Sequence, residues 1–270
     1  MRRGKNRPGQ LAGGEGAERG VAPMERQILF NTEMVRAILE GSKTQTRRIM
    51  KPQPTRNYPL GFVADSTNRA LIGRFGWGEH ELGGNQCDYA KPPCQPGDVL
   101  WVRETWADVN SEHGPGFTYK ADHDMRFCSD DAYPVEYERY PGCDFLMWCG
   151  DLWRGEPEHR WRKSIHMPRW AARLFLRVKS VRVERLQDIT EADAMAEGVK
   201  AYGQNNCSGT SARIAFAELW DSIYAKRGFG WDLNPWVFVV EFEKLDGEPK
   251  CVAPKEAVDD VEMYILRKRR

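Results

Sequence analysis

The chain has 270 residues, a formal net charge of +1, and 41% hydrophobic residues that include ten tryptophans. This composition supplies enough apolar surface for a folded core, so it excludes wholesale disorder. No apolar run approaches the roughly 20 residues of a membrane span, and no signal-peptide core is present. We therefore expect a cytoplasmic protein that does not enter a membrane. The nearly balanced charge argues against a protein that coats nucleic acid purely electrostatically.

The two ends of the chain lack the features of a folded domain. Residues 1–23 are rich in Gly and Arg, contain no aromatic residue and show no periodicity, which predicts a disordered extension before a natural start at Met24. Residues 246–270 form a polar tail, and its basic end at 267–270 is expected to be solvated rather than bound to nucleic acid. The folded domain is therefore predicted to span residues 24–245.

The first elements of this domain follow from local patterns. A short strand is expected at 28–30, and then a helix at 32–40 with Asn31 or Thr32 as its N-cap. Gly41 ends the helix in the left-handed conformation, and residues 43–49 continue as extended chain.

Further strands and helices are predicted along the rest of the chain. A buried strand is expected at 99–102 and another strand at 117–119. Alternation over 173–183 predicts one or two half-exposed strands. The remaining predicted elements are helices at 190–197 and 211–226 and a strand at 236–242. Many short strands with three helices predict a mainly β, α+β fold built on a small closed barrel. Residues 53–95 and 107–160 are expected to be insertions.

Residues 43–48 concentrate hydrogen-bond donors directly after the first helix. One lysine, two threonines and two arginines occupy this stretch, so it is suited to a phosphate or a polar base edge. A solvated surface strand is the alternative. Farther along, residues 159–183 contain eight lysines and arginines and no carboxylate, and several tryptophans adjoin arginines. This pattern predicts one basic face that meets phosphates. For Trp101, Trp220 and Trp236, a place in the core is the preferred interpretation.

The seven cysteines are irregularly spaced, and no CxxC pair occurs. An odd number without such pairs favours reduced thiols over a disulfide framework. A zinc site built from Cys87, Cys94, Cys143 and Cys149 is the alternative, but its spacings fit no standard zinc knuckle. We therefore expect neither a metal nor a cofactor.

Four blocks of sequence, in this order, resemble the ASCH family. The first is the pattern Gly41, Lys43, Thr46 and Arg48 after a short helix, and the others are residues 96–106, 164–171 and 186–198. The chain is most similar to the ASCH proteins that are common in phage and prophage genomes. The resemblance implies a PUA-like β-barrel and a partner that is RNA or a modified nucleoside.

The same resemblance implies a catalytic set. Some ASCH proteins are 4-acetylcytidine amidohydrolases, and their catalytic residues fall on Lys43 as base, Thr46 as nucleophile and Glu197 as proton donor. Glu197 also stands in the last turn of a predicted helix, where the helix dipole disfavours a carboxylate. Residues three apart in a regular strand face opposite sides, so Lys43 and Thr46 converge only if Lys43 precedes the strand or a bulge intervenes.

Other side chains are candidates for ligand binding. Arg47 and Arg48 lie beside the proposed nucleophile, while Arg103 and Glu104 leave the end of a predicted strand. A loop stiffened by proline would present two more candidates, His166 and Arg169, although a lone histidine is more often structural.

Two functions remain open from the sequence. The first is binding of RNA or a modified nucleoside in a basic barrel cleft, and the second is deacylation of 4-acetylcytidine or a related small amide. Nuclease action and a protein-interaction role are further alternatives.

Overall fold

The structure is a computed structural model that describes residues 23–54, 61–64, 66–81, 84–128, 140, 142–156, 159–200 and 211–247. The predicted tails at 1–23 and 246–270 lie almost entirely outside the described residues.

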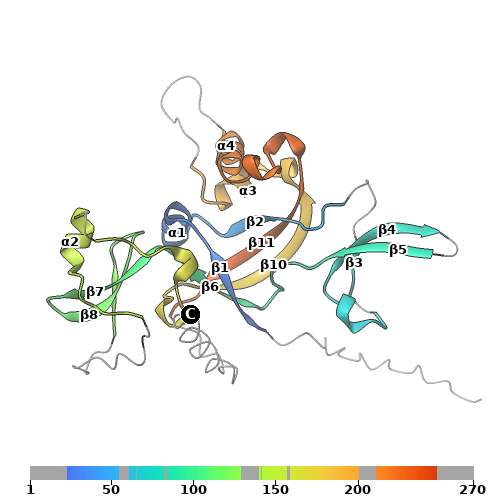
Figure 1. Ribbon diagram of the computed structural model, residues 1–270. Helices are drawn as coiled ribbons and strands as arrows, with labels where there is room; N and C mark the ends of the chain where they lie inside the picture. The colour runs from blue at the N-terminus through green and yellow to red at the C-terminus, as the bar shows by residue number, and fades with distance from the viewer. Residues whose placement is uncertain are drawn as a thin grey trace, which may run out of the picture.

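A five-stranded mixed sheet forms the centre of the molecule (Figure 1), with strand order β1-β6-β10-β11-β2. Its strands are β1 (Glu25–Leu29), β2 (Gln45–Ile49), β6 (Val99–Arg103), β10 (Phe175–Arg185) and β11 (Trp236–Lys244). β1 and β6 are parallel, and every other neighbouring pair is antiparallel. The alternating stretch that predicted one or two strands is the single long strand β10, whose register with β11 shifts between Val178 and Ser180. Such a bulge increases the bend of a strand.

The sheet is open, so the closed barrel predicted from the sequence is wrong. Among the described strands, β1 and β2 each have one neighbour and do not pair with each other. A side chain joins these two edges instead: Arg48 of β2 donates a hydrogen bond from Nη2 to the backbone oxygen of Leu29 at 2.8 Å. The coarser prediction is confirmed, because the fold is α+β and consists mostly of sheet with a few flanking helices.

Both faces of the sheet are buried along β11. Val237 and Val239 pack in the cluster that contains Phe216 and Trp220. The next residue, Val240, packs with α1 (Thr32–Leu39) on the opposite face. Because side chains alternate along a strand, one run of β-branched and aromatic residues packs against helices on both faces of the sheet.

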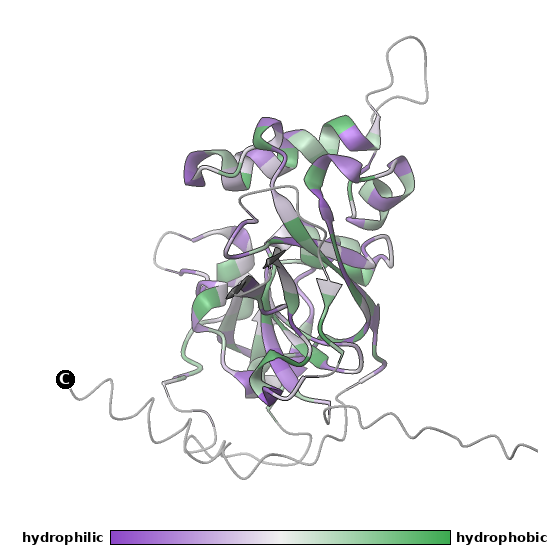
Figure 2. Ribbon diagram, turned by 90° about the vertical axis from the view of Figure 1, so that its right-hand side faces the viewer, coloured by the Kyte–Doolittle hydropathy of each residue, from purple (hydrophilic) through white to green (hydrophobic). Residues whose placement is uncertain are grey.

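The predicted helices occur within one or two residues of their expected ends. α1 is capped by Asn31, whose Oδ1 accepts from the Met34 amide, and Gly41 after it has φ of +78°. α3 (Glu191–Ala196) begins with the Thr190–Asp193 capping box, and α4 is Ala212–Tyr224. α3 and α4 lie together above the strands, and Figure 2 shows that both helices carry hydrophilic and hydrophobic residues. Among the described helices, none is both long enough and apolar enough to cross a membrane.

The two predicted insertions contain additional sheets, which lie at opposite ends of the central one in Figure 1. One holds β3 (Gly61–Phe62), β4 (Phe75–Glu81) and β5 (Gly84–Ala90). The other holds β7 (Trp106–Ser111), β8 (Gly114–Tyr119) and β9 (Met125–Phe127), followed by α2 (Cys149–Arg154). Each is packed onto the central sheet, the first through Trp77 and Phe238 and the second through Phe117 and Phe175. The strands at 61–90 were not predicted.

Candidate functional site

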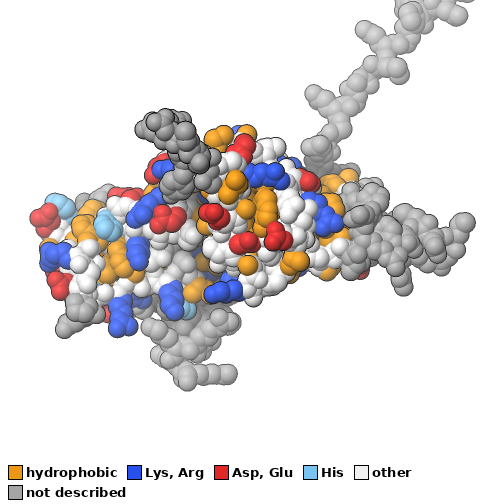
Figure 3. All heavy atoms as spheres, turned by 90° about the horizontal axis from the view of Figure 1, so that it is seen from above, with side chains coloured by type: hydrophobic (Ala, Val, Ile, Leu, Met, Phe, Trp, Pro, Cys, Tyr) orange, Lys and Arg blue, Asp and Glu red, His pale blue; other side chains and the backbone are white. Residues whose placement is uncertain are grey.

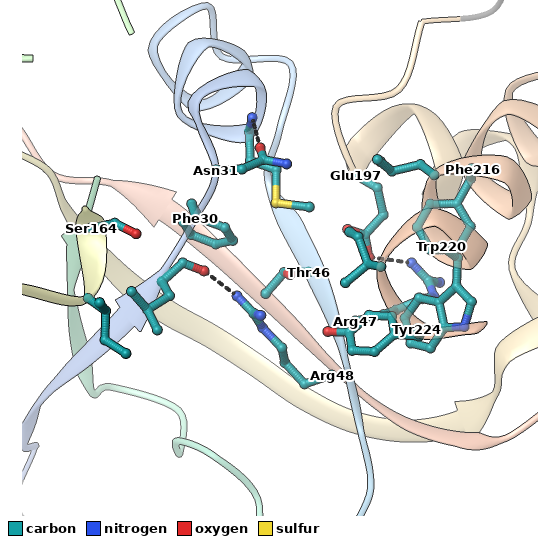
Figure 4. A pocket seen from close by; sticks show the side chains of 15 residues that line it. Phe30, Asn31, Thr46, Arg47, Arg48, Ser164, Glu197, Phe216, Trp220 and Tyr224 are labelled. Atoms are coloured by element: carbon teal, nitrogen blue, oxygen red, sulfur yellow. Dashed lines mark hydrogen bonds and ion pairs between the residues drawn. The ribbon is translucent and has the colours of Figure 1, made fainter. Parts of the chain in front are cut away.

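A cavity of about 300 Å³ lies between the two edges of the central sheet and α4 (Figure 4). Its walls are mostly apolar and aromatic, with a few polar groups that converge on the space. The lining residues are Leu29, Phe30, Asn31, Met34, Thr46, Arg47, Arg48, Ser164, Ile165, Glu197, Phe216, Leu219, Trp220, Ile223 and Tyr224. A small concave space of this composition is typical of a ligand site.

Glu197 is the charged centre of this site. It is the C-cap of α3 and only 5% exposed. Its Oε1 accepts from Arg47 Nη1 at 3.1 Å, and its Oε2 accepts from Lys43 Nζ at 2.8 Å. The two buried cations therefore offset the unfavourable interaction of the Glu197 carboxylate with the C-terminal end of the helix dipole.

Lys43 lies behind Glu197 rather than in the cavity wall. It precedes β2, as convergence with Thr46 required, and its backbone pairs with that of Glu197 in a single antiparallel β-bridge. Besides the carboxylate, its Nζ donates to the backbone oxygens of Glu197 at 2.8 Å and Gln45 at 2.9 Å. Burial lowers the pKa of Lys43, and the Glu197 carboxylate opposes that shift. All three ammonium protons have acceptors, so Lys43 acts on the cavity through Glu197.

A glycine permits this close approach of α3 to the start of β2. Gly198 has φ of +84°, and a Cβ atom there would lie 2.7 Å from Ala37 Cβ and 3.0 Å from Lys43 Cβ. A side chain at this position would therefore be strained and would push the Glu197 backbone away from Lys43.

Thr46 presents an unused hydroxyl to the cavity. It belongs to β2, pairs with Val240, and is 3% exposed. Its position among the polar groups is visible in Figure 4, between Arg48 and Glu197. Within the described part of the chain, no residue forms a hydrogen bond with its hydroxyl, which is therefore free to bind a ligand.

The two arginines of β2 hold the site together. Arg47 is buried, and it donates to Glu184 Oε1 from Nε at 3.0 Å and from Nη2 at 2.6 Å, while Nη1 faces Glu197. Its guanidinium is thereby fixed, and it orients the Glu197 carboxylate. Arg48 lines the cavity, with its guanidinium 5.3 Å from the centre of the Phe30 ring.

The structure places the other predicted ligand residues outside the cavity. Glu104 is 1% exposed and accepts two hydrogen bonds of 3.0 Å from Arg173; burial raises its pKa, and Arg173 opposes that rise. Arg169 donates to Glu25 at 2.8 and 2.9 Å. Arg103 donates to Gln27 and to the Ile165 carbonyl, beside the cavity mouth. His166 is exposed next to Ile165.

The continuous basic face predicted from residues 159–183 is not found in the described part of the chain. Acidic residues from other segments pair with most of these cations. The pairs are Arg162–Asp108, Arg169–Glu25, Arg173–Glu104, Lys179–Glu243 and Arg182–Glu241. Tertiary ion pairs therefore neutralise most of this run, while Arg160, Lys163 and Arg177 are exposed without an ion-pair partner among the described residues.

The sequence placed Trp220 in the core and gave no sign of a cavity beside it. Trp220 lines the cavity together with Phe216, Ile223 and Tyr224, which recur at helical spacing along α4. Their spacing identified the buried face but not the unfilled space beside it. Trp220 also donates from Nε1 to the Phe229 carbonyl at 2.7 Å, which fixes its ring.

The described cysteines do not form the zinc site considered from the sequence. Cys94 packs in the cluster with Leu100, whereas Cys149 packs with Val109 in the second insertion. Within the described residues, no group of metal-binding side chains is present.

Comparison of the chain with protein-family models, curated proteins and solved structures finds no match.

Proposed function

We propose that this chain is a PUA-like ASCH module whose cavity binds a modified nucleoside. The observation that carries the proposal is the cavity itself: aromatic walls surround a free threonine hydroxyl and a fixed carboxylate. The bridge from Arg48 to Leu29 holds the two edges of the open sheet together beside the cavity. Three of the four sequence blocks that resemble ASCH proteins contribute residues to the cavity wall, namely residues 46–48, 164–165 and 197.

The chemistry of the walls favours a planar heterocycle. Phe30, Phe216 and Trp220 offer apolar ring surfaces of the kind that pack against a base. The Glu197 carboxylate can only accept hydrogen bonds when ionised, so it selects a ligand N–H, while the Arg48 guanidinium selects an oxygen. A pyrimidine base carries both kinds of group on one edge.

Isothermal titration with 4-acetylcytidine, cytidine and uridine tests this proposal. We expect saturable binding that weakens in Thr46→Val, which removes the free hydroxyl but keeps the side-chain shape. Thr44→Val is the matched control, because Thr44 is exposed and does not line the cavity. Absence of binding to all three nucleosides would refute the proposal.

Amide deacylation is the second candidate, and the unpartnered Thr46 hydroxyl beside Glu197 favours it. In this scheme Thr46 Oγ1 attacks the acyl carbonyl carbon and loses its proton to Glu197. The C–N bond breaks, Glu197 returns the proton to the departing amine, and water then hydrolyses the acyl ester. Lys43 and Arg47 position Glu197 rather than contact the substrate. This assignment differs from the one implied by the family resemblance, in which Lys43 is the base.

The reaction is tested by incubating the protein with 4-acetylcytidine and following cytidine by chromatography. We expect cytidine release that is lost in Thr46→Val and in Glu197→Gln and retained in Thr44→Val. Saturable binding without release of cytidine would support nucleoside binding and refute the deacylation.

A further inference from the structure

Three aromatic rings stack at the surface of the second insertion, away from the cavity. The His123 imidazole lies parallel to the Trp153 indole, with ring centres 5.5 Å apart and planes 9° apart. It also lies parallel to the Trp161 indole, at 5.9 Å and 15°. Among the described rings, the two indoles contact His123 and not each other, so the imidazole separates them. We call these three residues the aromatic stack.

The stack is rigid and its outer ring is accessible. Trp153 is 38% exposed, yet its Nε1 donates to the hydroxyl of the fully buried Thr118 at 3.2 Å. Trp161 is half-buried and packs against the cluster that contains Leu152. His123 has φ of +60°, a backbone conformation that is uncommon for a residue with a side chain. A held, exposed indole loses little conformational freedom when a planar ligand stacks on it.

The charges around the stack suit a polyanion. Lys120, Arg160 and Lys163 are exposed and have no ion-pair partner among the described residues. The carboxylates on either side of His123, Asp122 and Asp124, are both paired with Arg173. At the end of the molecule that carries this insertion, Figure 3 shows hydrophobic and histidine side chains beside both basic and acidic ones. Aromatic rings combined with free cations bind single-stranded nucleic acid.

The stack and the cavity are joined by a short piece of chain. Trp161 belongs to the stack, and Ser164, three residues later, lines the cavity. Three residues of extended chain span at most about 11 Å, and the exposed Lys163 lies between them. On the other side, Arg36 of α1 donates from Nε to the Ala121 carbonyl at 2.5 Å, and Met34 of the same helix lines the cavity.

We propose that the aromatic stack is a second binding site, at which a base stacks on Trp153 while another base of the same strand occupies the cavity. The ligand is then a single-stranded oligonucleotide rather than a free nucleoside. This inference rests on the function proposed for the cavity, and it extends that function to a site on an insertion.

Titration calorimetry with free 4-acetylcytidine and with pentanucleotides that carry it centrally, as RNA and as DNA, tests the inference. The parent should bind the pentanucleotide more tightly than the nucleoside. Trp153→Ala should weaken pentanucleotide binding by about 5- to 100-fold, the loss expected for one base–aromatic stack, and leave nucleoside binding unchanged. Trp153→Phe should restore most of the affinity. The two backbones show whether RNA or DNA is the preferred strand.

Matched variants separate the stack from other effects. Trp148 is 43% exposed on the same insertion but lies outside the stack, so Trp148→Ala should bind like the parent. Lys163→Ala should lower the slope of log affinity against log salt by about 0.7, the value for one phosphate contact with a single strand. Lys200→Ala, at a lysine paired with Glu40, should not lower it.

The outcomes distinguish this inference from the proposed function. Nucleoside binding without any gain for the pentanucleotide, or equal losses in Trp148→Ala and Trp153→Ala, overturns the second site and leaves the cavity function. Pentanucleotide binding that depends on Trp153 but not on Thr46 overturns the cavity function, and it reduces the inference to a surface strand-binding site. Binding of neither ligand overturns both.

Discussion

The ammonium of Lys43 contacts both the carboxylate and the backbone carbonyl of Glu197, each at 2.8 Å, although 154 positions separate the two residues. One side chain thus fixes both the position of the α3 end and the orientation of its terminal carboxylate. Because neither partner is exposed to bulk water, the contact is part of the core as well as part of the site.

Neutralising Glu197 should therefore destabilise the fold. Glu197→Gln leaves the Lys43 and Arg47 cations buried without a countercharge, and we expect a loss of about 3 kcal/mol or more in the free energy of unfolding. Urea denaturation measures it. The control Glu40→Gln removes an exposed partner of Lys200, and it should cost about 1 kcal/mol or less. Equal effects of the two variants would contradict a buried ion pair.

Thr46→Val should separate function from stability. The hydroxyl has no partner in the described part of the chain, so its removal should change the free energy of unfolding by less than about 1 kcal/mol. Nucleoside affinity should nevertheless fall by roughly 5- to 10-fold, the usual effect of one neutral hydrogen bond. A large loss of stability would mean that the hydroxyl serves the fold rather than a ligand.

Glu104→Gln should show the opposite pattern. This carboxylate lies outside the cavity and is held by Arg173, so the substitution should reduce the unfolding free energy and leave nucleoside affinity unchanged. Calorimetry and urea denaturation of the same sample test both halves. Weaker nucleoside binding by a stably folded variant would show that Glu104 contributes to ligand binding.

Acid should weaken the fold partly through Asp193. Partial burial alone would raise its pKa, but hydrogen bonds from Gln45 and Thr190 and the nearby Arg47 lower the pKa to about 2. A carboxylate with a depressed pKa stabilises the fold above its unfolded pKa, near 3.9. That stabilisation is lost as the pH falls toward 2. Denaturation between pH 5 and pH 2 should show a shallower decline in Asp193→Asn than in the parent.

Local patterns predicted the elements that local interactions determine. The helix ends at Asn31, Gly41 and Thr190 depend on residues within four positions: Asn31 was one of two N-caps considered, Gly41 was predicted to end its helix, and the helix predicted from 190 begins after its N-cap Thr190. β11 was predicted because its run of β-branched and aromatic residues is unambiguous. The family-like spacing of two blocks grouped Lys43, Thr46 and Glu197, and the structure places Thr46 and Glu197 at one cavity with Lys43 behind Glu197.

The errors concern interactions between distant segments. Sheet closure depends on whether β1 and β2 meet, and no pattern within either strand determines that. The prediction of a continuous basic face overlooked distant partners in the same way: Asp108 pairs with Arg162, although 54 positions separate them. The strands of the first insertion contain glycines at 76, 78 and 84, which lower β propensity, so the sequence did not predict them.

The position of β11 between β10 and β2 has a consequence for synthesis. β2 ends at Ile49, but its only partner in the described sheet starts at Trp236, so most of the chain must be made before β2 can pair. Until then the backbone groups of β2 have no strand to form hydrogen bonds with. The cavity wall that contains Thr46 also lacks α4 beside it. The binding cavity is thus among the last parts of the nascent chain to assemble, and this long-range pairing should make folding slow compared with a helical protein of similar length.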